Sequence, residues 1–110
     1  MTEYTPDNWV IVKVPSTDKY VEHYRVLAGW SGGYLNGDAW QLNSGIVRIE
    51  EDDVYYRFYG KSGSCYVCHK ESYMVRMNIA NVLHTLETVH NVTLMDEDTD
   101  WMNMKWKNDD

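Results

Sequence analysis

The sequence predicts a mostly β protein of one domain, a small and strongly bent antiparallel barrel of about five or six strands with one covering helix. Two observations carry this prediction. Before residue 71, short segments rich in β-branched and aromatic residues alternate with turn residues. After residue 71, the apolar spacing changes to that of a helix. The 110 residues of the chain are the length of a single domain, 1–110.

Three extended segments are expected in the first half of the chain. Residues 8–15 (NWVIVKVP) predict a strand, because β-branched residues favour strands and Pro15 stops them. Residues 23–30 (HYRVLAGW) predict a second strand, and residues 39–45 (AWQLNSG) predict a shorter third. The Asn36-Gly37 pair between them is a strong hairpin signal.

The middle of the chain predicts a meander of short strands. IVRIE (46–50) and VYYRFYG (54–60) flank an acidic turn, and SCYVCH (64–69) follows the turn GKSG. Polar and apolar residues alternate in both of the first two segments, as in half-buried strands.

One helix is expected over about residues 73–90, with Ser72 as its N-cap. Apolar residues recur there at helical spacing and form a stripe that suits the covering of a sheet: Val75, Ile79, Val82, Leu83, Leu86 and Val89. Residues 92–95 (VTLM) predict a last strand. The acidic tail, about 96–110, is interpreted either as docked or as disordered.

The charge balance disfavours a nucleic-acid binder that depends on phosphate contacts. The chain has 10 basic and 17 acidic residues and a net charge of −7, whereas such affinity comes from Lys and Arg. Ten of the acids lie in three clusters, at 50–53, 96–100 and 109–110. The rest of the chain therefore leaves room for a neutral or mildly basic face.

The termini and the cysteines predict a cytoplasmic protein. The segment MTEYTPDNW lacks the basic and apolar regions of a secretory signal. No apolar run approaches the roughly 18 residues of a membrane span, so no membrane partner is expected. The two cysteines are interpreted as reduced thiols.

Cys65, Cys68 and His69 have the spacing that attaches a c-type haem. The surrounding residues predict a strand, in which Cys65 and His69 point one way and Cys68 the other. Haem is therefore a minority alternative. A zinc site is also disfavoured, because there is one cysteine pair and because His84 and His90 fall on different faces of the predicted helix.

Other catalytic motifs are incomplete. GWSGG (29–33) has the glycines and serine of a nucleophile elbow, but no helix is expected after it. GKSGS (60–64) lacks the upstream glycine of a phosphate loop. The acidic cluster at 96–100 lacks the glycine of a calcium loop. The sequence predicts no enzyme, no metal and no cofactor.

The segment YRVLAGWSGGYLNGDAWQLNSG, with the turns after it, resembles small uncharacterised proteins of tailed cyanophages and marine viral metagenomes. That group is similar in fold to Sm-like proteins, whose barrel belongs to the SH3-like class. If the chain is phage-encoded, the resemblance implies the cytoplasm of an infected bacterial host.

Gly33, Leu35 and Gly37-Asp38, followed by Leu42-Asn43, are similar to the first Sm motif. The resemblance implies that Asp38 orients Asn43, which contacts an RNA base. Tyr59-Gly60-Lys61 corresponds to the second motif, so Tyr59 and Lys61 would line the same RNA-binding site. The alternative is that Asp38 and Asn43 only cap local backbone amides, as turn residues do.

Two functions of different class remain open. The first is a non-catalytic assembly or interaction module that forms a homo-oligomer, since short aromatic strands join well at their edges. The second is an Sm-like ring that binds single-stranded RNA by stacking. A haem or metal protein using Cys65, Cys68 and His69 is the minority alternative.

Overall fold

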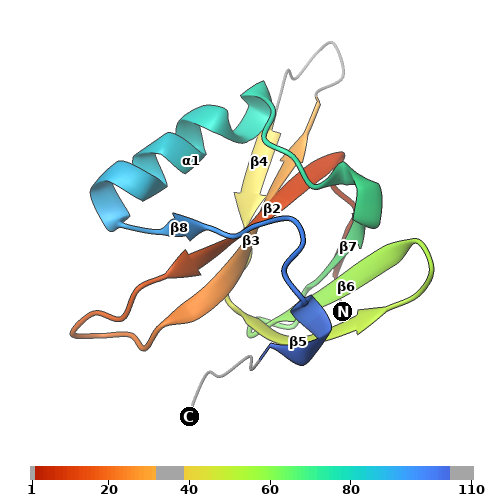
Figure 1. Ribbon diagram of the computed structural model, residues 1–110, viewed down its shortest axis with the longest axis horizontal. Coiled ribbons are helices and arrows are strands. Elements are labelled where there is room, and N and C mark those ends of the chain that lie inside the picture. The colour runs from red at the N-terminus through yellow and green to blue at the C-terminus, as the bar shows by residue number, and fades with distance from the viewer. Residues whose placement is uncertain (1, 32–38, 105–110) are drawn as a thin grey trace.

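The computed structural model describes residues 2–31 and 39–104. These residues form two four-stranded sheets and one long helix (Figure 1). The elements in chain order are β1 (Glu3–Tyr4), β2 (Asn8–Val14), β3 (His23–Trp30), β4 (Ala39–Leu42), β5 (Ile46–Glu51), β6 (Tyr55–Gly60), β7 (Cys65–His69), the 3-10 turn η1 (Lys70–Ser72), α1 (Met77–His90), β8 (Thr93–Leu94) and the 3-10 turn η2 (Trp101–Asn103).

One sheet has the strand order β1-β7-β6-β5, and the other has the order β4-β3-β2-β8. Neighbouring strands are antiparallel except for β1, which pairs in parallel with β7. The mostly β fold with a single covering helix is therefore confirmed. The closed barrel of five or six strands is not: the described residues form eight strands, and their pairings give two separate sheets.

The two sheets and α1 form three layers. Strand β2 lies in the middle layer, because both of its faces are buried. Trp9 and Ile11 point into an aromatic core between the two sheets. Val10 and Val12 point to the other face, where they pack against Ile79 and its neighbours on α1. These four side chains are each at most 1% exposed. The run of β-branched residues thus forms the central layer, with α1 on one side and the second sheet on the other (Figure 1).

The predicted strands at 8–15, 23–30, 46–50, 54–60 and 64–69 are confirmed to within two residues at either end, and 39–45 and 92–95 contain the shorter strands β4 and β8. The Asn36-Gly37 turn lies outside the described residues. The tail docks as far as it is described, because Trp101 in η2 is 2% exposed and faces Phe58 and Tyr73 at ring distances of 6.5 and 6.0 Å.

The helix begins later than the sequence predicts, at Met77, and Ser72 does not cap it. The reason is that residues 73 and 74 are used by the sheet. Tyr73 forms a parallel bridge with Trp9, and the amide of Met74 donates to the Trp9 carbonyl at 3.1 Å. A backbone held in this extended pairing cannot also make the first turn of a helix, so Arg76 becomes the N-cap.

A buried pair of asparagines joins the start of α1 to β2. The Asn78 amide donates to Asn8 Oδ1 at 2.7 Å, and the Asn8 amide donates back to Asn78 Oδ1 and to the Met74 carbonyl, each at 3.1 Å. Gly29 makes room for this pair, since a Cβ there would lie 2.7 Å from the Asn78 amide group. Polar groups in the core thus fix where the helix meets the sheet.

Asn8→Ala is expected to lower the free energy of unfolding by about 2–3 kcal/mol, because it leaves the Asn78 amide and the Met74 carbonyl buried without their partner. Urea unfolding monitored by circular dichroism measures this. Asn103→Ala is the control, because Asn103 is exposed and should change stability by less than about 0.5 kcal/mol. Equal effects of the two substitutions would contradict the role of the buried pair.

Candidate functional site

A polar pocket of about 610 Å³ lies where the edge strand β4 of one sheet faces β1, β7 and the turn before β7 in the other. If the two sheets formed one closed barrel, their backbones would have to pair with each other at this place. Among the described residues, its wall contains no carboxylate side chain. The wall is formed by Thr2, Tyr4, Arg25, Gln41, Leu42, Asn43, Ser44, Ser62, Gly63, Ser64 and Tyr66.

Side chains, not backbone, connect the two sheets at this pocket. The Gln41 amide on β4 donates to the Tyr66 hydroxyl on β7 at 2.9 Å. The ring of Tyr4 on β1 lies 5.0 Å from the ring of Tyr66. Burial raises the pKa of the Tyr66 hydroxyl, which therefore stays protonated and able to donate at neutral pH. One end of the pocket is thus lined by uncharged polar and aromatic groups.

Asn43 anchors the chain where it crosses from β4 to β5. Its side chain is buried, and its Oδ1 accepts from the amides of Val26 and Gly45 at 2.9 and 3.3 Å. Only the carbonyl oxygen of the side chain can accept two N–H groups, so these contacts fix which way the amide points. Nδ2 then has no hydrogen-bond partner among the described residues. Asn43 is therefore both a turn cap and a buried donor left unsatisfied.

A chain of serine hydroxyls forms the floor next to Asn43. Ser44 Oγ donates to Ser62 Oγ at 3.1 Å and accepts from the Ser62 amide at 2.9 Å, and Ser64 Oγ lies 3.4 Å from Ser62 Oγ. The close approach requires a glycine at position 60, where a Cβ would lie 3.0 Å from Ser44 Oγ. The one hydroxyl proton that this chain leaves unused can turn toward the pocket.

Arg25 contributes the positive charge of the pocket. It lies on β3, two residues before Leu27, which pairs with Leu42 at the end of β4. Its Nε donates to His23 Nε2 at 3.0 Å, while His23 Nδ1 lies 2.9 Å from the Val21 carbonyl. This carbonyl can only accept, so Nδ1 carries the proton and Nε2 is free to accept from Arg25. Burial lowers the pKa of the Arg25 guanidinium, yet the group remains charged at neutral pH because an arginine pKa is so high.

The residues expected to bind RNA are brought together only in part. Asn43 lines the polar pocket, and Lys61 lines an adjoining hollow of about 160 Å³ that shares Arg25 and Ser44 with it. Tyr59 belongs to a different surface: its hydroxyl donates to Glu50 at 2.9 Å on the outer face of the β1-β7-β6-β5 sheet. Asp38 lies outside the described residues.

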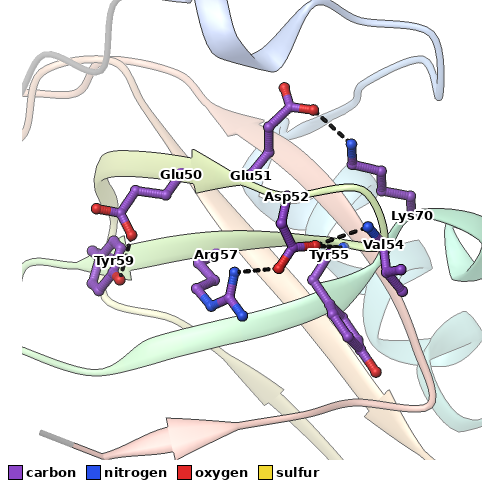
Figure 2. A network of polar contacts seen from close by, with 8 residues as sticks. All are labelled: Glu50, Glu51, Asp52, Val54, Tyr55, Arg57, Tyr59 and Lys70. Atoms are coloured by element: carbon purple, nitrogen blue, oxygen red, sulfur yellow. Dashed lines mark hydrogen bonds and ion pairs between the residues drawn. The ribbon is translucent and has the colours of Figure 1, made fainter.

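The outer face around Tyr59 carries charges that neutralise one another (Figure 2). Asp52 Oδ1 accepts from the amides of Val54 and Tyr55, both at 2.8 Å, and Oδ2 accepts from Arg57 at 2.9 Å. Arg48 pairs with Glu50 on the same face, whereas Lys70 pairs with Glu51 at 2.6 Å beside Tyr56, on the other face of the sheet. Because Asp52 and Glu50 each have an arginine as partner, the outer face offers few free charges to a ligand.

The cysteines of the haem-like motif lie on a strand, as the surrounding residues predict. Cys68 is part of the core between the sheets, and Cys65 is buried on the opposite face of β7. Both are free thiols, and burial raises the pKa of each. Within residues 2–31 and 39–104, no three His, Cys, Asp or Glu side chains gather as metal ligands would.

Sequence reasoning missed Arg25, Gln41 and the serine chain as a group. Arg25 did give a signal, since it is the one Lys or Arg inside the mostly apolar and aromatic segment HYRVLAGW. The serines gave none, because Ser44 is 18 residues from Ser62. Only the crossing of the chain between the sheets brings them together.

Comparisons with protein-family models, with curated proteins and with solved structures find no match to this chain. None of the helices in the described part of the chain is long and apolar enough to cross a membrane.

The Asp52 contacts predict a dependence of stability on pH. The Tyr55 amide, the Arg57 guanidinium and the Val54 amide hold the pKa of Asp52 well below its usual range. The group therefore stabilises the folded state above its unfolded pKa of about 3.9, and this contribution is lost as the pH falls below that value toward the folded pKa. Asp52→Asn should lower the Tm most at neutral pH.

Melting curves of the wild type and Asp52→Asn between about pH 7 and about pH 2 test this, and the Tm difference should shrink below about pH 4. Asp53→Asn removes the same charge one residue further along the turn and serves as the control. A Tm difference for Asp52→Asn that is constant over this range would contradict the prediction.

Proposed function

We propose that this chain is a non-catalytic assembly module that forms a homo-oligomer through the free edge of β4. The observation that supports it is the contrast between the two longer edge strands, β4 and β5. Each ends its sheet, so one side of each backbone has no neighbouring strand in the described part of the chain. A free strand edge is a template for pairing with another chain unless it is protected.

Strand β5 is protected in ways that natural sheets use against pairing. Its register is broken by a bulge between Ile46 and Arg48. Arg48, Glu50 and Glu51 place charges along it. At one end, η2 packs next to the strand. A second copy would therefore meet an irregular and charged edge here.

Strand β4 has none of these protections. Its residues, Ala39 to Leu42, carry no charge. The Asn43 amide points toward β3, where it donates to the Val26 carbonyl at 3.0 Å. Because amides alternate in direction along a strand, those of Trp40 and Leu42 point to the free side. Trp40 is also 50% exposed, and tryptophan is enriched at the centres of protein interfaces.

Trp40→Lys is expected to weaken self-association by about thirtyfold or more, since it replaces an interface tryptophan with a charge on a pairing edge. Light scattering across micromolar concentrations should give a multiple of 13.0 kDa for the wild type and a mass near 13.0 kDa for the variant. Val47→Lys, on the protected edge of β5, is the matched control and should keep the wild-type mass. A wild type that is monomeric throughout this range would refute the proposal.

Binding of single-stranded RNA is the second proposal, and the position of Asn43 favours it. Asn43 lines a polar pocket, its Nδ2 is buried without a hydrogen-bond partner among the described residues, and Lys61 lines the hollow next to that pocket. Because Tyr59 lies on another face, the proposed RNA-binding site is smaller than the one that the Sm resemblance implies. The resemblance to cyanophage proteins, and with it the place of action, remains a prediction.

A further inference from the structure

Two positive side chains, Arg25 in the polar pocket and Lys61 in the hollow beside it, form no ion pair among the described residues. The ion pairs of the described residues use Lys13, Arg48, Arg57 and Lys70. Arg25 and Lys61 take part in none of these pairs, although the whole chain has seven more acidic than basic residues. In an acidic protein, two unpaired cations at adjoining hollows form a local positive site to which anions are attracted.

Arg25 is held ready for a ligand. His23 accepts from its Nε at 3.0 Å and so fixes the plane of the guanidinium. The two terminal nitrogens make no hydrogen bond to the described residues and can donate together to one anion. A partly buried guanidinium is the group best suited to such paired contacts with a phosphate or a carboxylate.

Neutral donors surround this charge. Asn43 lies in the wall, and its buried Nδ2 has no hydrogen-bond partner among the described residues. The serine hydroxyls and the Thr2 hydroxyl lie in the same wall. The described wall holds no Asp or Glu that would repel an anion. The number and spread of these donors suit the several oxygens of a phosphate better than the two of a carboxylate.

We propose that this pocket binds the phosphate group of a small polar phosphomonoester, of the size of a sugar phosphate. Arg25 and the hydroxyl groups of the wall hold the phosphate, and Lys61 adds positive charge from the adjoining hollow. The pocket volume of about 610 Å³ is far larger than a phosphate ion needs and falls in the usual range for small-ligand sites. Gln41 and the Tyr66 hydroxyl line the remaining space and suit a hydroxylated ligand. This inference does not depend on self-association.

Calorimetric titration of the full chain at fixed ionic strength tests the ligand class. The probes are glucose 6-phosphate, inorganic phosphate, glucuronate and glucose, which separate the phosphate, the carboxylate and the uncharged sugar. Glucose 6-phosphate should bind at least about tenfold more tightly than glucuronate or glucose. Equal affinity for glucuronate and glucose 6-phosphate would overturn the proposal. So would a titration in which neither glucose 6-phosphate nor phosphate binds up to about 10 mM.

Three variants that each remove one positive charge test the site. Arg25→Gln and Lys61→Gln should each weaken glucose 6-phosphate binding, Arg25→Gln by about tenfold or more. Arg76→Gln, before α1, is the control and should leave the affinity unchanged. If Arg25→Gln fails to fold, the exposed Lys61 still decides the outcome.

Three results would count against the site: equal losses in Arg25→Gln and Arg76→Gln, an unchanged affinity in Lys61→Gln, or binding of a uridine-rich RNA strand with none of the small phosphates. The last of these would favour the RNA proposal instead.

Discussion

The side chain of Trp9 holds the three layers of this protein together. It is 1% exposed, and its ring packs against Phe58 and Tyr73 at centroid distances of 5.4 and 4.8 Å. Its indole N–H donates to the carbonyl of His69 at 2.7 Å, and its own carbonyl accepts from the Met74 amide. One residue of β2 therefore contacts the second sheet with its ring and fixes the segment that leads into α1 with its backbone.

The pocket is a consequence of how the sheets pack around that core. The sheets are joined by a chain crossing at residues 43–45, where Asn43 caps two backbone amides and Gly45 has a φ of 124°, in the region that favours glycine. Beyond the crossing, β4 and β7 are linked by side chains such as Gln41 and Tyr66. The backbone thus leaves a hollow at the point where a barrel would have closed, and polar side chains fill its wall.

Charge is distributed differently on the two polar surfaces. On the outer face of the β1-β7-β6-β5 sheet, Asp52 pairs with Arg57 and Glu50 pairs with Arg48. Such exposed pairs add little to stability and leave little free charge. At the pocket, Arg25 contacts a neutral histidine instead. Only the arrangement at the pocket leaves a cation with unused hydrogen-bond donors. The pocket is therefore the better candidate for ligand recognition.

The sequence by itself determined the strands, because β-branched residues and turn residues act locally, and it determined that one helix covers a sheet. It could not determine where that helix begins, since the pairing of Tyr73 with Trp9 joins residues far apart in the chain. It also could not show that the strands form two sheets, because each strand pattern is compatible with several partners. The candidate site was found in part, through Asn43 and Lys61. Arg25 and the serines joined it only through the crossing of the chain, which brings distant side chains together and gives no local signal.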